Sequence, residues 1–458
     1  MRSVVYGRRV DWLEPLRCPR CRAGVAAKGD GLQCSGCATS YPSVGGIPVL
    51  LADAEAALAQ WRWRLHDFQA SNADVRANLL AQLATEQMLP ATRRRLELLR
   101  THLEAHEQRL TALLGEAGIR AEKRGAPDSA AVPGEGTITA HYEQLHRDWS
   151  WDADGNTEAA EAAEAVAAVL PADAALGRVL VLGAGAARLA RDVHVRHRAT
   201  STLALDINPL PFVVARRVLA GQSVELLEFP VRPARSDVPC VSRVLRSDQP
   251  VTEGVRLLIA DGLAPPVAPG SFDTVLTPWF VDQVPQDAAT LLPVIHAALR
   301  EGGTWIQFGP LIYQPNHTRL VHRYCQDELA ELTAAAGFVI ERSTAERMPY
   351  LQSPAGSQGR TELVITWAAR KAGAPATRAP AETPPWLVDL LLPVPRLPGM
   401  DAYVAPHALF AAIVALVDGR RSVLEIASVM ANKHGLPGDR ADAAVQTALK
   451  MIAAELRG

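Results

Sequence analysis

The sequence of 458 residues predicts an α/β protein built around an open, mostly parallel sheet. Three observations support this prediction. First, short apolar runs typical of buried parallel strands recur at 178–182, 202–205 and 257–260. Second, the glycine turn Gly183-Ala184-Gly185 follows the first run and precedes a predicted helix. Third, the carboxylate of Asp206 ends the second run about 20 residues after the turn, which is typical of a nucleotide-binding βαβ unit.

The other strands of the sheet follow in order along the chain. Segments 271–277 and 304–308 are predicted to be the fourth and fifth strands, and a helix at 291–300 separates them. Two later runs, 338–341 and 362–367, are predicted to form a hairpin. The hairpin completes a Rossmann-like, seven-stranded sheet.

The glycine turn alone favours a packing role over a cofactor site, because glycine turns precede helices in many sheets. The residues that follow the turn favour a cofactor. A ligand can approach the backbone closely at Gly183 and Gly185 because neither residue has a Cβ. The carboxylate of Asp206 is placed to accept hydrogen bonds from both ribose hydroxyls of an adenosine cofactor. Ala187-Arg188 follows where the dinucleotide fingerprint has its third glycine, which argues against a bound pyrophosphate.

This order of strands, helices and glycines resembles the class I methyltransferases, which use S-adenosylmethionine. The resemblance implies that Gly183 and Gly185 border the methionine part of the cofactor and that Asp206 holds the ribose. It also implies that Asp261 and Gly262, which end the third apolar run, meet the adenine. S-adenosylmethionine is therefore the expected cofactor.

Composition and charge narrow the class of protein. Hydrophobic residues make up 48% and charged residues 21% of the chain, as in an ordinary globular protein, and the net charge is −2. No overall field therefore favours nucleic acid or an anionic membrane as a partner. No run reaches the ~18 apolar residues of a membrane span, and the N-terminus has no apolar signal core. A cytoplasmic protein is expected.

Two CxxC pairs near the N-terminus predict a metal centre in residues 1–53. Cys18 and Cys21 form the first pair, and Cys34 and Cys37 form the second. Two such turns that face each other make a closed tetrahedral Zn²⁺ site, and a site with four cysteine ligands is structural because it has no open position. A redox CxxC pair and a chance occurrence are the alternatives.

The residues around these cysteines resemble a known zinc-ribbon family. The run CPxC, CxxC, YPxxxGIPVLL over the first ~50 residues is similar to small zinc-ribbon proteins that bind and stabilise tRNA- and ribosome-modifying methyltransferases. The resemblance implies that the ribbon supports or docks on the enzyme to which it is fused, and that it takes no part in catalysis.

Residues 54–120 are predicted to be helical, with an interruption at Pro90. Leucines at helical spacing favour a seam between helices over a binding surface. These are Leu96, Leu99, Leu103, Leu110 and Leu114. Residues 121–138 are polar and rich in Gly, Pro and Ala, so we expect a linker there.

Three motifs within 139–371 together resemble the carnosine N-methyltransferase family. They are QLHRDW at 144–149, WFVD at 279–282 and FGPLIY at 308–313, which correspond in order to that family's QxxRDW, FIDTA and GPLLYH segments. The resemblance implies that Gln144 and Arg147 fold over the methionine end of the cofactor, where a guanidinium binds a carboxylate as a bidentate pair. Read alone, the first motif is an ordinary amphipathic helix.

Asp282 is the main candidate for chemistry on the methyl acceptor. A carboxylate at the carboxyl edge of the sheet can accept the N–H of an imidazole, which leaves the other ring nitrogen free to attack the methyl group. A helix-capping role is the alternative. Tyr350 aligns with a substrate-facing tyrosine of the family. Gln314 stands where the family has a histidine, and Arg360-Thr361 replaces a tyrosine-rich run, so the acceptor can differ from carnosine.

The C-terminal part is predicted to be a separate helical module. A linker rich in Pro and Ala at 372–385 precedes it. In residues 386–458, the sequence LVDGRRSVLEIASVMANKHGL resembles PqqD-like winged-helix modules, which bind leader peptides. A leader peptide or partner protein is thus one expected ligand, and a packing domain is the alternative. DNA binding is disfavoured because the predicted second helix carries few basic residues.

These features predict an S-adenosylmethionine-dependent N-methyltransferase. The expected acceptor is an imidazole nitrogen of a small molecule or peptide that bears histidine. One alternative is methylation of another natural product or of RNA, which the near-neutral charge disfavours. The other is a regulatory or peptide-binding protein that keeps the cofactor without turnover.

Overall fold

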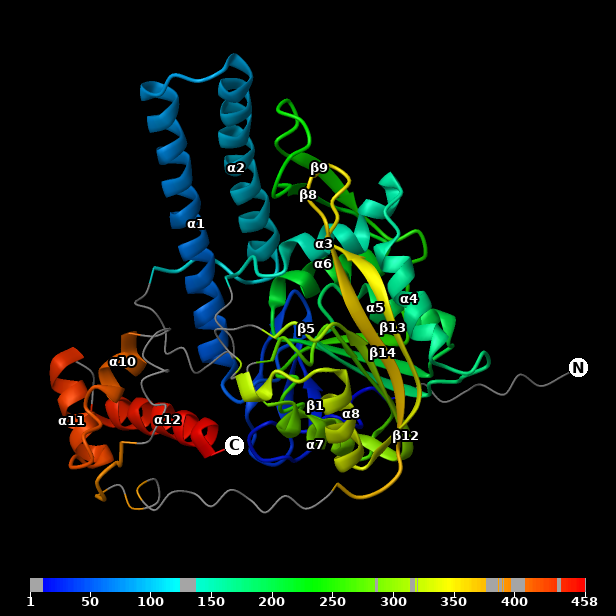
Figure 1. The fold of residues 1–458 in the computed structure, drawn as a ribbon, viewed down its shortest axis with the longest axis vertical. Helices are drawn as coiled ribbons and strands as arrows, with labels where there is room; N and C mark the ends of the chain where they lie inside the picture. Colours follow the sequence, from blue (N-terminus) through cyan, green and yellow to red (C-terminus); the bar gives the residue numbers. More distant parts are fainter. Residues whose placement is uncertain are drawn as a thin grey trace, which may run out of the picture. The chain divides into compact units, whose positions relative to one another are not determined.

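The computed structural model describes the residues in the following ranges: 11–123, 137–284, 287–313, 318, 320–375, 386, 389, 391–396, 408–434 and 438–457. The chain divides into two compact units, Met1–Pro375 and Ala376–Gly458. The first unit contains the cysteine pairs, a helical hairpin and the predicted sheet (Figure 1).

Seven strands form the central sheet, in the order β10-β7-β6-β11-β12-β14-β13. Their bounds are β6 Arg178–Leu182, β7 Ser201–Asp206, β10 Val255–Ile259, β11 Phe272–Pro278, β12 Leu299–Gly309, β13 Phe338–Tyr350 and β14 Arg360–Lys371. The first five strands of this order run parallel, and β14 is antiparallel to both of its neighbours. The predicted Rossmann-like, seven-stranded sheet is confirmed. Its order reverses at β6 and β11, where open α/β sheets bind ligands.

The strands of the sheet are rich in apolar side chains because helices cover the sheet. Val179, Leu180, Val181 and Leu182 of β6 are all fully buried, as expected for a central parallel strand. The covering helices are α4 Glu158–Ala168, α5 Arg188–Arg196, α6 Pro209–Leu219, α7 Ala288–Ala298 and α8 Gln326–Ala335. Among the described residues, no helix has the length and apolarity that a membrane span requires.

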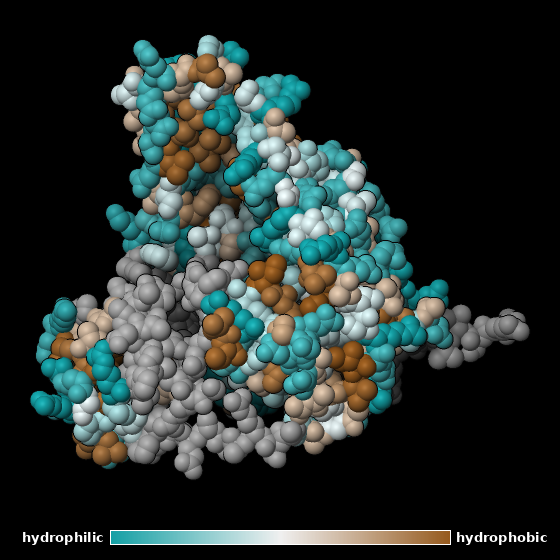
Figure 2. Space-filling model, in the orientation of Figure 1, coloured by the Kyte–Doolittle hydropathy of each residue, from teal (hydrophilic) through white to brown (hydrophobic). Residues whose placement is uncertain are grey.

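Helices α1 Ala54–Thr85 and α2 Pro90–Glu116 form a helical hairpin. The side chain of Asp53 caps α1 by accepting the N–H of Ala56 at 2.9 Å, and Pro90 starts α2 because proline needs no N–H donor there. The far part of the hairpin projects from the sheet and exposes apolar side chains (Figures 1 and 2). The exposed ones are Val75, Leu80, Leu89 and Leu98.

Between α2 and β10 the chain also forms two short helical elements and a two-stranded β-hairpin that lies outside the main sheet. Helix α3 covers Tyr142–Trp149, and a 3₁₀ turn, η2, covers Trp151–Asp154. Strands β8 Val224–Glu228 and β9 Val241–Leu245 form an antiparallel pair outside the main sheet. The loop after β8 pairs with the loop after β13 through a β-bridge between Pro233 and Gly356.

The N-terminal ribbon covers the β10 edge of the sheet. Its strands are β1 Val25–Lys28, β2 Gly31–Cys34, β3 Ser40–Tyr41, β4 Ser43–Val44 and β5 Ile47–Pro48. Val49 forms a parallel bridge with Ile259, and the N–H of Leu50 donates to the carbonyl of Ile259 at 2.8 Å. The ribbon thus extends the main-chain pairing by one short segment and shields an exposed strand edge.

The second unit has its own core. It contains α10 Ala408–Val414, α11 Val423–His434 and α12 Gly438–Arg457. Apolar side chains of the three helices are buried together with Trp386 and Val394. The hydroxyl of Ser422 accepts the N–H of Glu425 at 3.2 Å, while the N–H of Ser422 donates to the Glu425 carboxylate at 2.8 Å, which is a capping box at the start of α11.

The contact between ribbon and sheet predicts a stability effect at Leu50. In the variant Leu50→Pro the N–H donor to the buried carbonyl of Ile259 is lost, and so is a leucine side chain that is 1% exposed. The free energy of unfolding should therefore fall by at least about 3 kcal/mol. Urea unfolding followed by circular dichroism measures this. Ala52→Ser, at a nearby exposed position, is the control. Equal midpoints for the two variants would show that the contact contributes nothing.

Candidate active site

A cavity of about 310 Å³ lies at the carboxyl ends of β6, β7, β10 and β11. This volume lies within the range of sites for small molecules and cofactors. The sequence-predicted cofactor residues all line this one cavity, and Tyr350 lines it too. The cofactor residues are Gln144, Arg147, Gly183, Gly185, Asp206, Asp261 and Gly262. Residues from five separate parts of the chain are therefore brought together at the predicted edge.

The glycines of the turn are required by their surroundings. Gly183 and Gly185 have φ of 72° and 54°, in the left-handed region. A Cβ on Gly183 would lie 2.4 Å from Cδ2 of Phe280, and a Cβ on Gly262 would lie 2.8 Å from Cζ of the same ring. Gly183 and Gly262 thus make room for Phe280, which itself lines the cavity.

Asp206 is held at the end of β7 by two backbone donors. Its Oδ2 accepts the N–H of Gly185 at 2.8 Å, and its Oδ1 accepts the N–H of Asn208 at 2.9 Å. Burial raises the pKa of this carboxyl, although the two N–H donors and nearby His141 act in the opposite direction. Each carboxylate oxygen can accept a further hydrogen bond, so the geometry fits the hydroxyls of a ribose.

Helix α3 presents Gln144 and Arg147 to the cavity from adjacent turns. Nε of Arg147 donates to Asp148 at 2.7 Å, whereas its two Nη atoms make no hydrogen bond within the described part of the chain. The pair of free donors fits a carboxylate such as that of a methionine group. The indole Nε1–H of Trp149 anchors the helix by donating to the carbonyl of Ala186 at 2.9 Å.

Aromatic side chains form the wall opposite the glycines. The rings of Trp279 and Tyr350 lie 4.5 Å apart between centroids. Trp279 has a φ of 50°, and its N–H donates to the carbonyl of Phe308 at 2.7 Å. Nε2 of Gln144 lies 3.5 Å from the hydroxyl of Tyr350, which links α3 to this wall.

The buried carboxylate of Glu158 fixes the chain after Tyr350. Its two oxygens accept the N–H groups of Leu351 at 2.8 Å and Gln352 at 2.7 Å. Glu158 also lines the cavity, as do His141 and Arg64 of α1. Sequence analysis missed these three residues. Glu158 and Arg64 lie in helices rich in similar residues, so no local pattern distinguishes them.

Asp282 lies close to the cavity but does not line it. Its side chain is 1% exposed, and its neighbours Phe280, Gln283 and Val284 form the cavity wall instead. Oδ2 accepts the N–H of Ile312 at 2.9 Å, and Oδ1 has no hydrogen-bond partner among the described residues. Burial raises the pKa of Asp282 to about 6.

The other two acceptor-side predictions have different outcomes. Tyr350 lies at the cavity, where the sequence predicts it. Gln314 falls outside the described residues. The structure therefore places one of the three predicted acceptor-side residues in the cavity wall and a second one behind that wall.

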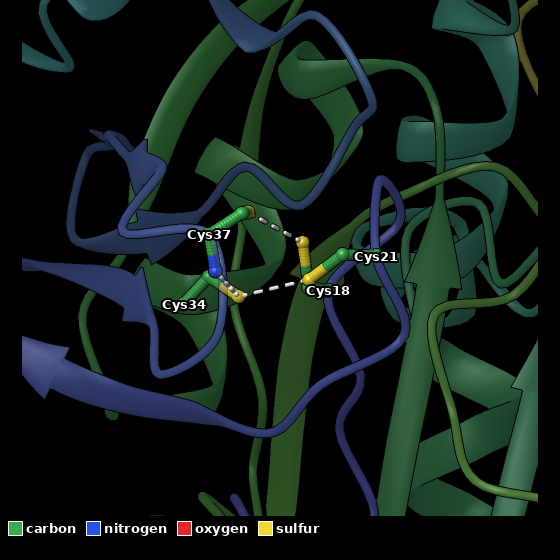
Figure 3. Close-up of side chains that lie close together, drawn as sticks. All are labelled: Cys18, Cys21, Cys34 and Cys37. Carbon is green, nitrogen blue, oxygen red and sulfur yellow. Dashed lines mark hydrogen bonds between the residues drawn. The ribbon is translucent and has the colours of Figure 1, made fainter.

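The four N-terminal cysteines converge at one point (Figure 3). All their Sγ atoms lie within 4.8 Å of one another; Cys21 and Cys34 are 3.4 Å apart, and Cys18 and Cys37 are 3.7 Å apart. Zinc–sulfur bonds of about 2.3 Å in a tetrahedron place the sulfurs about 3.8 Å apart, so this donor set fits a structural Zn²⁺.

Neighbouring groups support the cysteine cluster. The hydroxyl of Tyr41 lies 3.0 Å from Sγ of Cys18, and the N–H of Gly36 donates to Sγ of Cys34 at 3.3 Å. A Cβ on Gly36 would lie 2.7 Å from Cβ of Ala23, so a larger residue would displace the second pair. Such contacts orient ligands and stabilise thiolates.

The ribbon also holds the loop that follows Asp261. The N–H of Arg17 donates to the carbonyl of Pro266 at 2.7 Å, and the N–H of Ala268 donates to that of Pro15 at 2.7 Å. Nη2 of Arg22 donates to the carbonyl of Val267 at 2.7 Å. Because Asp261 and Gly262 begin this loop, the cysteine cluster and the cavity share one supporting segment.

Part of the chain matches the model of a known protein family. Residues 247–372 match the family model of carnosine N-methyltransferase. No curated protein shows significant similarity to the chain.

Three solved structures share low similarity with it. An S-adenosylmethionine-dependent methyltransferase from Mesorhizobium loti is 20% identical, over 46% of this chain and 99% of that one, with a TM-score of 0.31. A SAM-dependent methyltransferase from Methanosarcina mazei is 13% identical, over 45% and 95%, with a TM-score of 0.31. A chain from the Haloferax volcanii complex of the Trm112 methyltransferase activator with a methyltransferase is 16% identical, over 52% and 96%, with a TM-score of 0.34.

Removal of the metal should affect both the ribbon and the cavity. We expect chelation, or the variant Cys34→Ser, to lower the melting temperature and to weaken S-adenosylmethionine binding by about 10-fold, because about 1.4 kcal/mol of loop positioning is lost. Calorimetric titration and elemental analysis for zinc measure this. Cys325→Ser, at an exposed cysteine outside the cluster, is the control. Unchanged affinity in the metal-free protein would refute the supporting role.

The raised pKa of Asp282 predicts a pH-dependent stability. Between pH about 4 and 6 the folded protein binds more protons at this carboxyl than the unfolded chain, so the free energy of unfolding should fall as pH rises. Asp282→Asn lacks this ionisation. Its stability relative to the native protein should therefore increase by about 1–3 kcal/mol across that window and stay constant above it. Urea unfolding at several pH values tests this, and a difference that does not change with pH would contradict it.

Proposed function

We propose that this protein is an S-adenosylmethionine-dependent N-methyltransferase that acts on histidine. Residues 247–372 match the family model of carnosine N-methyltransferase. The acceptor is an imidazole nitrogen in a small molecule or peptide. The observation that carries this proposal is the buried Oδ1 of Asp282, which has no hydrogen-bond partner among the described residues and lies next to the cavity wall. An unsatisfied buried acceptor favours a ligand that donates an N–H.

The cavity residues divide between the parts of the cofactor. When bound, S-adenosylmethionine supplies an electrophilic methyl group on a sulfonium. The free Nη donors of Arg147, with Gln144 beside them, hold the methionine carboxylate. Asp206 accepts the ribose hydroxyls, and Asp261 and Gly262 meet the adenine. Each contact uses a group that already lines the cavity.

Asp282 orients the acceptor. Because the carboxylate is buried behind the wall that Phe280, Gln283 and Val284 form, this wall has to open before the carboxylate accepts one imidazole N–H. That hydrogen bond selects a tautomer and directs the lone pair of the other nitrogen towards the methyl group. Imidazole is mostly neutral at pH 7, so alignment matters more than a strong base. Transfer would form an N–C bond as the S–CH3 bond of the sulfonium breaks, with S-adenosylhomocysteine as the leaving group. The resulting imidazolium would lose its N–H proton to Asp282 and then to solvent.

Tyr350 and Gln314 complete the proposed acceptor side. The ring of Tyr350 packs at a tilt of 44° against Trp279, and its hydroxyl interacts with Gln144, so the ring is positioned between α3 and the sheet edge. We assign it to the wall that holds the acceptor ring. Gln314 offers an amide where the related family has a histidine, and an amide can donate and accept hydrogen bonds but cannot titrate.

We propose support and recruitment roles for the terminal parts of the chain. The zinc ribbon stabilises the loop after Asp261 through its backbone contacts. For the C-terminal unit, with its own buried core and its PqqD-like sequence, we propose binding of a leader peptide or partner protein.

Two variants separate cofactor binding from transfer. Asp206→Ala should weaken S-adenosylmethionine binding by about 100-fold, because a charged hydrogen-bond acceptor is lost. Asp282→Asn should bind the cofactor normally and lower the rate constant of transfer by at least about 100-fold. Calorimetry measures the first effect. Mass spectrometry of histidine dipeptides and histidine-containing peptides measures the second, as the gain of one methyl group in place of hydrogen.

The native protein should modify the imidazole ring and leave otherwise identical peptides with alanine in place of histidine unmodified. Full activity in Asp282→Asn would remove its proposed role. Binding of the cofactor without transfer to any histidine probe would refute the acceptor class.

A further inference from the structure

Helix α1 starts at the carboxyl edge of the sheet, on the β10 side of the cavity. The chain runs parallel to β10 at Val49, which forms a bridge with Ile259, so it leaves this pairing at the carboxyl end of β10. The ribbon then leads into α1, which begins at Ala54 (Figure 1). Arg64 lies about ten residues further along, which is about 15 Å along the helix axis. This path brings the first turns of α1 past the β10 end of the cavity.

Two buried neighbours fix the rotation of α1 at Arg64. Trp61 and Leu65 are both 0% exposed, and both belong to the main core. Arg64 follows Trp61 by about one turn and directly precedes Leu65, so it lies at the margin of the buried face of the helix. Arg64 is half-buried, and it lines the cavity. The packing of its neighbours therefore keeps Arg64 at the cavity wall.

The surroundings of Arg64 suit a ligand that has both acceptor atoms and an aromatic face. Burial lowers the pKa of Arg64, although a guanidinium remains charged at every ordinary pH. The planar guanidinium donates N–H groups in its plane and packs its face on aromatic rings. A purine offers ring nitrogens as acceptors and an aromatic face, so it complements both properties of the group.

The order of the strands places this end of the cavity on the adenosine side. Strands β10 and β7 are the first two of the sheet, and residues 261–263 and 206–208, which follow them, line the cavity. Tyr350 ends β13, which is the last strand of the same order. Gln144, which interacts with the Tyr350 hydroxyl, extends the wall towards that side. Helix α1 is thus next to the strand ends that are expected to hold the ribose and the adenine.

We propose that Arg64 binds the adenosine part of S-adenosylmethionine, so that the helical hairpin forms part of the cofactor site. Its guanidinium faces the purine, while Asp206 accepts the ribose hydroxyls and Arg147 holds the methionine carboxylate. Residues 54–120, for which the sequence predicts a seam between helices, thus take part in cofactor binding. The inference depends on the cofactor and holds for any methyl acceptor.

Two ligands that share the adenosine part test the proposal. The full-length, zinc-loaded protein is titrated with S-adenosylhomocysteine and with 5′-methylthioadenosine, which lacks the amino acid part. Arg64→Met should weaken both ligands by about 10-fold, because one contact with a charged group is lost from the part that they share. Methionine is a good helix former, so α1 should fold in this variant. A loss confined to S-adenosylhomocysteine, or no loss for either ligand, would overturn the proposal.

Two matched variants calibrate the titrations. Arg147→Met removes the guanidinium that is assigned to the methionine carboxylate, so it should weaken S-adenosylhomocysteine alone. Arg62→Met removes an equal charge from a position of α1 outside the cavity wall and should keep the native affinity for both ligands. A loss in Arg62→Met equal to that in Arg64→Met would assign the effect to the charge of α1 and would contradict a contact at Arg64.

Protection from alkylation separates a direct contact from an effect on folding. In the variant Arg64→Cys, iodoacetamide alkylates the new thiol, and mass spectrometry of the peptide that contains position 64 gives the rate. At ten times its Kd, 5′-methylthioadenosine should slow this reaction by about 10-fold, because only the unoccupied protein reacts. Arg62→Cys is the control and should react at the same rate with and without the ligand. No protection at position 64, or equal protection at both positions, would refute the contact.

Discussion

The carboxylate of Asp206 is the constraint on which the cavity depends. It lies at the end of β7, where burial disfavours its charge, and the N–H groups of Gly185 and Asn208 stabilise that charge. The bond to Gly185 joins the turn after β6 to the end of β7. That turn also packs directly against Phe280 at Gly183 and lies near Gln144 at Gly185. One half-buried charge therefore fixes the positions of two strand ends and, through them, the surfaces that face a ligand.

Elements outside the sheet complete this arrangement. Glu158 holds the chain after Tyr350, and Trp149 anchors α3 on the carbonyl of Ala186. On the opposite side, the ribbon holds the loop after Asp261 through backbone hydrogen bonds at Arg17 and Ala268. These hydrogen bonds between the ribbon and the loop join backbone groups, so they do not depend on side-chain identity. They fix loop positions with little effect on the chemistry within the cavity.

The sequence was sufficient for those parts of the site that have local signatures. Apolar runs mark β6 and β7, a turn with positive φ requires Gly183, and the spacing of four cysteines predicts the ribbon cluster. Glu158 has no such signature, because its carboxylate acts through hydrogen bonds to residues more than 190 positions away. The sequence could not predict the position of Asp282 behind the cavity wall either, because this position depends on a hydrogen bond from the N–H of Ile312, 30 residues away.

The fusion of the ribbon to the enzyme has a physical consequence. Its contact with β10 consists of a short segment around Val49 and Leu50, and each net hydrogen bond contributes only about 1 kcal/mol. Two separate chains would also lose translational and rotational freedom on association, which costs at least about 4 kcal/mol. Within one chain that loss is small, because the effective concentration of the ribbon at the sheet edge reaches the millimolar range or above. The covalent link therefore adds to the buried apolar contacts and hydrogen bonds of the ribbon in keeping the edge of β10 covered and the loop after Asp261 in place.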